Sequence, residues 1–192
     1  MDTKEHISTI VPAQISVGVV GLGLMGCSIT TCLLMAGHPV VAIAPLPIDL
    51  ETAEARIHEH LVQSFEQEIC LEQPVFYLKN LMITEDYTRL KDTSLVVEST
   101  LEDITIKRQV YKNIENVVAD HAIITSNTSA IPISLLQKEV RSPNRFFEIK
   151  YARISVLAKT IFYVCTKVFN FKNETNQVSL HIAKNICIYF MI

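Results

Sequence analysis

The stretch Val17-Gly18-Val19-Val20-Gly21-Leu22-Gly23-Leu24-Met25-Gly26 is a short apolar run that ends in a Gly-x-Gly-x-x-Gly pattern. Gly21 allows a tight turn, Gly23 lets the backbone approach a pyrophosphate, and Gly26 lets a helix pack closely on a strand. The amides that open the next segment, 24–35, would face the phosphates if that segment is a helix. The stretch therefore predicts a strand–turn–helix unit that binds a dinucleotide, with a purely structural turn as the alternative.

The rest of the chain alternates between strand and helix patterns. The expected strands are residues 15–20, 40–44, 82–84, 95–98 and 123–126, and the expected helices are 24–35, 50–69, 104–118 and 133–136. Such alternation predicts a parallel sheet with helices on both faces. The predicted fold class is therefore α/β, a Rossmann-type, doubly wound and mainly parallel sheet.

Composition restricts the kind of protein further. The 192 residues are 49% hydrophobic and 19% charged, and the net charge of −3 argues against a nucleic-acid partner. Five cysteines without metal-ligand spacing predict reduced, buried thiols and no metal site. The charged start, 1–6, lacks an apolar signal core, and the apolar run 161–171 is too short to span a bilayer. We expect an intracellular protein, cytoplasmic rather than organellar, with no membrane partner.

The character of the chain changes after Phe147. Residues 148–192 contain no glycine and no proline, and six lysines and arginines outnumber two glutamates there. This change predicts a nucleotide-binding domain over residues 13–151 and an atypical aromatic and basic tail over residues 152–192.

Two further motifs follow the ends of expected strands. Glu98 and Glu102 follow the strand 95–98, and Asn127 and Ser129 follow the strand 123–126. In a doubly wound sheet, ligands bind outside the carboxyl ends of the strands. We expect the two motifs to meet in one crevice beside the glycine-rich loop, although residues 127–129 could also cap the next turn.

These motifs together resemble the NAD-binding domain of the 3-hydroxyacyl-CoA dehydrogenases and of relatives such as the lambda-crystallin-like L-gulonate dehydrogenases. The resemblance covers residues 13–151 and rests on the order and spacing of Gly21-Leu22-Gly23-Leu24-Met25-Gly26, Ala36-Gly37-His38, Val97-Glu98, Glu102-Asp103, Lys107, Ser126-Asn127-Thr128-Ser129 and Arg145-Phe146-Phe147. It implies an NAD-dependent oxidoreductase of fatty-acid β-oxidation that oxidises a 3-hydroxyacyl-CoA to the 3-ketoacyl-CoA. Family relatives dimerise through a helical second domain, and the short tail of this chain stands in its place.

The resemblance also implies roles for individual residues. Ser129 matches the serine that hydrogen-bonds the reacting oxygen, and the position of the catalytic histidine falls on Lys150, so these two are the expected catalytic residues. The expected cofactor-binding residues are Gly21, Leu22, Gly23, Leu24, Met25, Gly26, Glu102, Lys107 and Asn127.

Three positions depart from the family pattern. The carboxylate that grips the adenine ribose falls on Ala44, with Asp49 nearby but displaced and no arginine at that turn to indicate NADP. The catalytic histidine falls on Lys150, and its orienting glutamate falls on Phe162. A lysine has a pKa near 10.4, so about one in a thousand is a free base at neutral pH unless burial lowers that pKa. The departures predict weaker ribose recognition and put catalysis in question.

Two other functions stay open. The chain could be a non-catalytic NAD(H)-binding module whose tail binds a partner, or a dehydrogenase of another 3-hydroxy acid. The pattern Gly-Leu-Gly-x-Met-Gly also opens the 3-hydroxyisobutyrate and 6-phosphogluconate dehydrogenases, which use a catalytic lysine. Their downstream glycine-rich substrate motif is missing here, and the block Asn127-Thr128-Ser129 favours the acyl-CoA family.

Overall fold

The computed structural model describes residue 13, residues 15–156 and residues 159–167. Its strands are β1 Val17–Val20, β2 Val40–Ile43, β3 Leu81–Thr84, β4 Leu95–Glu98, β5 Ile123–Ser126, β6 Phe146–Val156 and β7 Lys159–Lys167. Its α-helices are α1 Leu24–Met35, α2 Pro47–Glu66, α3 Pro74–Leu78, α4 Ile104–Glu115 and α5 Ile133–Leu136. Short 3₁₀ helices cover η2 Tyr87–Asp92, η3 Gln137–Glu139 and η4 Pro143–Arg145.

The strands form one sheet in the order β3-β2-β1-β4-β5-β6-β7. The pairs from β3 to β6 are parallel, and β7 is antiparallel to β6. Val20 at the end of β1 lies opposite both Ile43 of β2 and Glu98 of β4. The strand order reverses at β1, which is the point where doubly wound sheets bind their ligands. The structure therefore confirms the predicted Rossmann-type fold.

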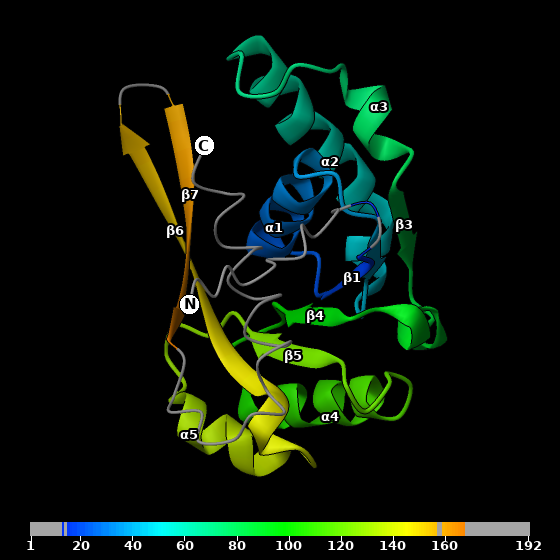
Figure 1. Ribbon diagram of the computed structural model, residues 1–192, viewed down its shortest axis with the longest axis vertical. Helices are drawn as coiled ribbons and strands as arrows, with labels where there is room; N and C mark the ends of the chain where they lie inside the picture. Colours follow the sequence, from blue (N-terminus) through cyan, green and yellow to red (C-terminus); the bar gives the residue numbers. More distant parts are fainter. Residues whose placement is uncertain (1–12, 14, 157–158, 168–192) are drawn as a thin grey trace, which may run out of the picture.

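The two faces of the sheet bury separate cores. Val17, Val19 and Ala42 belong to a core cluster with residues of α1 and α2, whereas Val96 and Ile124 belong to a cluster with residues of α4. Successive strand residues point to opposite faces, so β1, β2, β4 and β5 each contribute to both clusters. Figure 1 shows α1 and α2 on one side of the sheet and α4 and α5 on the other, with the β6–β7 hairpin projecting beyond it.

Some element boundaries differ from the sequence-based expectations. Helix α2 begins at Pro47 rather than at residue 50, because proline is favoured at the first helical position. Helix α3 and strand β6 were not expected. Strand β6 pairs with β5 from Phe146 to Glu148 and runs across residue 151, so the change in composition after Phe147 does not interrupt the sheet. The division of the chain at residue 151 stays a prediction.

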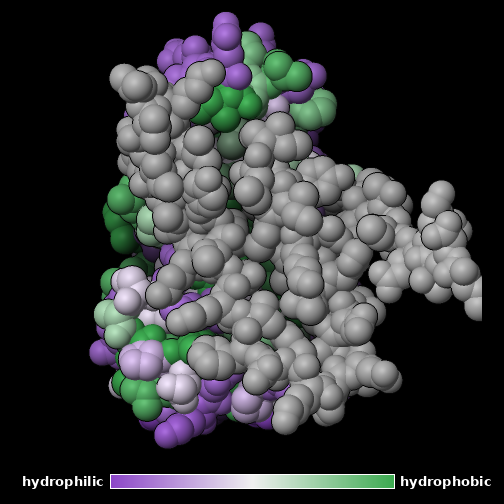
Figure 2. Space-filling model, turned by 60° about the vertical axis from the view of Figure 1, so that its left-hand side comes forward, coloured by the Kyte–Doolittle hydropathy of each residue, from purple (hydrophilic) through white to green (hydrophobic). Residues whose placement is uncertain are grey.

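Exposed apolar side chains lie around the end of α2. Phe65 is 38% exposed, and Ile69 and Leu71, which follow the helix, are 41% and 88% exposed. Figure 2 shows hydrophobic and hydrophilic side chains together at the top of the molecule, at the height where α2 ends in Figure 1. Among the described helices, none is long and apolar enough to cross a membrane.

Candidate functional site

A cleft of about 470 Å³ opens at the carboxyl ends of β1 and β4. Its walls come from the glycine-rich loop after β1, the start of α2, the loop between β4 and α4, and the turn after β5. The lining residues are Gly21, Gly23, Leu24, Met25, Pro45, Leu46, Asp49, Ser99, Thr100, Leu101, Glu102, Ile106, Asn127 and Ser129. The cleft thus lies at the switch point of the sheet, where a doubly wound fold is expected to bind its ligand.

The three glycines of the Gly-x-Gly-x-x-Gly motif have different surroundings. Gly21 has φ +95°, a conformation that residues with side chains rarely adopt. A Cβ at Gly26 would lie 1.8 Å from the carbonyl oxygen of Gly21, whereas a Cβ at Gly23 would meet no atom within 4 Å. The fold therefore requires Gly21 and Gly26, while Gly23 leaves open space beside the N-terminus of α1. An approaching phosphate fits this arrangement, because helix N-termini attract anions.

Glu98, at the end of β4, is completely buried and accepts hydrogen bonds from five donor groups. Its Oε1 accepts from Lys107 Nζ at 2.7 Å and from the amide and hydroxyl of Thr100 at 2.7 and 2.6 Å. Its Oε2 accepts from the hydroxyls of Ser126 and Tyr111 at 2.6 and 2.9 Å. These contacts fill the acceptor positions of the carboxylate. Glu98 and Lys107 therefore form a closed ion pair beneath the cleft that ties β4, β5 and α4 together.

Tyr111 was missed by the sequence analysis. Burial, followed by the charge of Glu98, raises the pKa of its hydroxyl well above the usual value of 10. The hydroxyl therefore stays protonated and donates to Glu98. The spacing carried a signal, since Lys107 and Tyr111 are four residues apart and share one face of α4.

Glu102 holds the turn that follows β5. Its carboxylate accepts from the backbone amides of Ser129 and Ala130 and from the hydroxyls of Thr128 and Ser129. Partial burial on its own raises the pKa of Glu102. The amides of Ser129 and Ala130, the Thr128 hydroxyl and the Lys107 charge outweigh it, so the pKa lies below its usual value. An ionised Glu102 thus fixes the turn that presents Ser129 to the cleft.

Thr128 gives weight to the capping alternative for this motif. Its hydroxyl accepts from the Ile131 amide at 3.1 Å and contacts Glu102 at 3.0 Å. Asn127 donates from Nδ2 to the Ser99 hydroxyl at 3.2 Å and also lines the cleft. The motif is therefore both a structural turn and a wall of the site.

The acidic residue near the end of β2 is Asp49 in the first turn of α2. Ala44 is buried at 2% exposure, and Asp49 lines the cleft at 8% exposure. Arg56 Nη1 lies 3.5 Å from Asp49 Oδ1 and donates to the carbonyl of Leu22 at 3.1 Å. An arginine thus lies near this part of the cleft although the turn itself carries none, because α2 brings Arg56 back to the glycine-rich loop.

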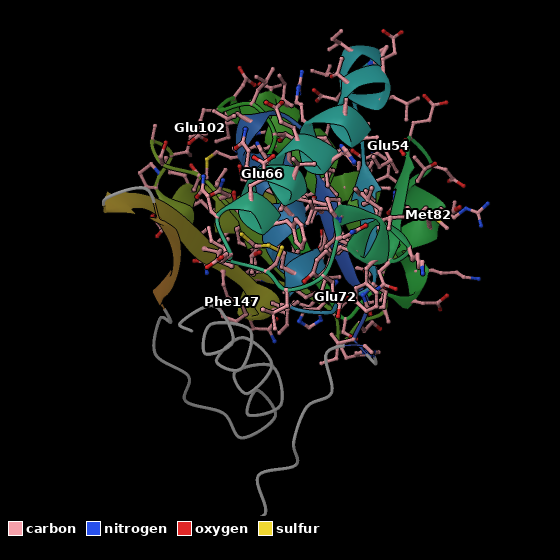
Figure 3. All side chains as sticks on the ribbon, turned by 90° about the horizontal axis from the view of Figure 1, so that it is seen from above. Glu54, Glu66, Glu72, Met82, Glu102 and Phe147 are labelled. Atoms are coloured by element: carbon pink, nitrogen blue, oxygen red, sulfur yellow. The ribbon has the colours of Figure 1, made fainter. Side chains whose placement is uncertain are left out.

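The structure brings most of the predicted residues to the cleft. Gly21, Gly23, Leu24, Met25, Glu102, Asn127 and Ser129 line it, whereas Leu22, Gly26 and Lys107 are buried behind it. Seen from above, Glu102 lies on the same side of the molecule as Phe147 of β6, and Met82 of β3 lies at the opposite edge of the sheet (Figure 3).

Lys150 is placed by its backbone. Strand β6 continues two residues past Glu148, which pairs with Ser126 at the end of β5, so the backbone of Lys150 lies at the carboxyl edge of the parallel strands. Its side chain lies outside the described part of the structure, as do those of Phe162 and the rest of the tail. The catalytic role of Lys150 stays a prediction.

Comparison with known proteins agrees with this geometry. Residues 16–160 match the family model described as 3-hydroxyacyl-CoA dehydrogenase, NAD binding domain. The peroxisomal fatty acid beta-oxidation multifunctional protein MFP2 of Arabidopsis thaliana is 30% identical over 139 residues, which is 71% of this chain and 19% of that protein.

Solved structures are also similar to this chain. The structure of FadB2 of M. tuberculosis is 30% identical, with a TM-score of 0.67, over 71% of this chain and 48% of that one. The 3-hydroxybutyryl-CoA dehydrogenase of Escherichia coli is 26% identical, with a TM-score of 0.66, over 71% of this chain and 29% of that one. The chain therefore spans about a fifth of the curated relative and about half of FadB2.

Proposed function

Because this chain belongs to the family of 3-hydroxyacyl-CoA dehydrogenase NAD-binding domains, we propose that its cleft binds NAD(H) as part of an oxidoreductase acting on 3-hydroxyacyl-CoA. The observation that carries the proposal is the open space over Gly23, between the N-terminus of α1 and the wall formed by Asn127 and Ser129. The relatives' names mention 3-hydroxybutyryl-CoA dehydrogenation and fatty acid beta-oxidation, which supports the substrate class.

Different residues of the chain would bind the cofactor and position the substrate. The glycine-rich loop and the first amides of α1 would bind the pyrophosphate. Bound NAD would supply the hydride acceptor. The hydroxyl of Ser129, which donates to Glu102 in this structure, would hydrogen-bond the reacting oxygen, and Lys150 would hold or accept the proton of that oxygen.

A titration of the purified chain with NADH, followed by the fluorescence of the bound cofactor, tests the binding proposal. Gly23→Val should weaken binding roughly ten-fold or more, because the new side chain occupies the space that the phosphates need. The melting temperature should stay within a few degrees of wild type, since no atom lies within 4 Å of the new Cβ. Equal NADH affinity of the two proteins would contradict the site.

Catalysis is tested separately by following NADH oxidation with acetoacetyl-CoA. Turnover that falls with Ser129→Ala and with Lys150→Ala, at unchanged NADH affinity, would support both catalytic assignments. NADH binding without turnover would instead favour the non-catalytic module, for which the lysine at the histidine position is the supporting observation. Turnover with a free 3-hydroxy acid, and none with the CoA ester, would favour a dehydrogenase of another 3-hydroxy acid.

We also propose a reducing, intracellular location, with the cytoplasm as the expected compartment. Cys27, Cys32 and Cys70 are free and buried, which is usual for proteins of reducing compartments. Two relatives are named as peroxisomal and glyoxysomal proteins. Imaging of the tagged chain against a peroxisomal marker decides between the two compartments.

A further inference from the structure

We propose that Asp49 recognises the adenine ribose of the dinucleotide, from the first turn of α2, in place of a carboxylate at the end of β2. The inference rests on the proposed NAD(H) site and adds a specificity-determining residue to it. Ala44 directly follows β2, at the position where the family pattern has a carboxylate. Its side chain is a buried methyl group without a polar atom.

The acceptor capacity of the acidic side chains singles out Asp49. Glu98 accepts hydrogen bonds from five donor groups beneath the cleft, and Glu102 accepts from the amides and hydroxyls of the turn after β5. Within residues 15–156, the polar contact of the Asp49 carboxylate is the ion pair with Arg56 at 3.5 Å. A carboxylate can accept about four hydrogen bonds, so Asp49, which borders the cleft, keeps acceptor positions for a ligand there.

The position of Asp49 suits a ribose beside the glycine-rich loop. Asp49 lines the same cleft as Gly21 and Gly23, with Pro45 and Leu46 between it and the end of β2. Arg56 bridges Asp49 to the carbonyl of Leu22, so the carboxylate is held at a fixed place relative to the loop. Two ribose hydroxyls could therefore donate to an oriented acceptor, which is how carboxylates select NAD over NADP.

The negative charge of Asp49 should also affect the choice between NADH and NADPH. A 2′-phosphate at this place would meet a like charge, so NADH should bind more tightly than NADPH. Arg56 is neutralised by Asp49 in the folded chain. Removal of the carboxylate should leave this guanidinium free to meet a 2′-phosphate, because arginine is the common partner of that group.

The experiment measures displacement of NADH by ADP and by 2′-deoxy-ADP, two probes that differ only in the adenosine 2′-hydroxyl. The wild-type chain should bind ADP about ten-fold more tightly than 2′-deoxy-ADP, as expected for a hydrogen bond to a charged acceptor. Asp49→Ala should bind both equally and should gain affinity for NADPH. The matched control is Glu54→Ala on the same helix, whose exposed side chain (Figure 3) lies outside the cleft lining.

The outcomes separate the inference from the function on which it rests. Wild-type discrimination between the two probes, lost in Asp49→Ala and kept in Glu54→Ala, would support the role of Asp49. Equal binding of the two probes by the wild-type chain, or unchanged discrimination in Asp49→Ala, would overturn that role while the NAD(H) site stands. Failure of the wild-type chain to bind either ADP or NADH would overturn the site itself, and the inference with it.

Discussion

Gly23, which caps α1, and Gly26, in the first turn of α1, differ in what an added side chain would contact. Gly26→Ala places a methyl group 1.8 Å from the backbone oxygen of Gly21. Because a backbone atom cannot move aside cheaply, we expect the free energy of unfolding to fall by about 3 kcal/mol or more. Thermal denaturation followed by circular dichroism measures the loss, and Gly23→Ala serves as the control that should melt like the wild type.

Cys32 is the residue for which burial has the largest chemical consequence in α1. Burial raises the pKa of its thiol to about 12, so roughly one in ten thousand is a thiolate at pH 8. We therefore expect iodoacetamide to leave Cys32 unmodified in the folded chain and to modify it rapidly in urea. Peptide mass mapping checks this at each cysteine, and labelling of Cys32 at equal rates in both conditions would contradict its burial.

The packing of elements against each other depends on the Glu98–Lys107 pair, which is fully buried between β4, β5 and α4. Lys107→Met removes the cation and leaves a buried carboxylate, which should cost about 3–5 kcal/mol of unfolding free energy. Lys112→Met on the same helix is the control, because Lys112 is exposed and its loss should cost below about 1 kcal/mol. In urea titrations, equal midpoints for the two variants would contradict the importance of the pair.

The stability that the turn between β5 and α5 gives to the fold should depend on pH. The folded pKa of Glu102 lies below its usual value of 4.5, so its ionised form stabilises the fold above about pH 4.5. This contribution disappears as the pH falls through the lower, folded pKa. The difference in melting temperature between the wild type and Glu102→Gln should therefore be largest near neutral pH and shrink on acidification. Glu51→Gln, at an exposed position of α2, should show no such trend.

At the scale of the whole molecule, the two core clusters of the described residues draw their members from residues 15–149. Strand β6 closes the parallel sheet through Phe146–Glu148, and β7 contacts it as an antiparallel hairpin. We expect a chain of residues 13–156 to unfold cooperatively and to bind NADH as the 192-residue chain does. A non-cooperative melt or lost NADH binding would mean that the fold needs residues beyond 156 and would contradict the predicted division near residue 151.

Local patterns in the sequence determined the central strands and the first helix of this protein. The strands at 17–20, 40–43, 95–98 and 123–126 and the helix from Leu24 follow from apolar runs and from the glycine triplet, because these signals act over a few neighbouring residues. The placement of Gly21, Glu102, Asn127 and Ser129 around one cleft also follows, since the carboxyl ends of parallel strands share an edge.

Only the tertiary structure decided which charged side chains face the cleft and which are held by hydrogen bonds and ion pairs inside the protein. Glu98 and Glu102 look alike in the sequence, yet one is buried beneath the cleft and the other clamps a turn. Asp49 and Arg56 meet because α2 begins at Pro47 and passes back over the glycine-rich loop. Hydrogen-bond satisfaction depends on residues far apart in the chain, so no local pattern encodes it, whereas strand and helix periodicity is local and can be read directly.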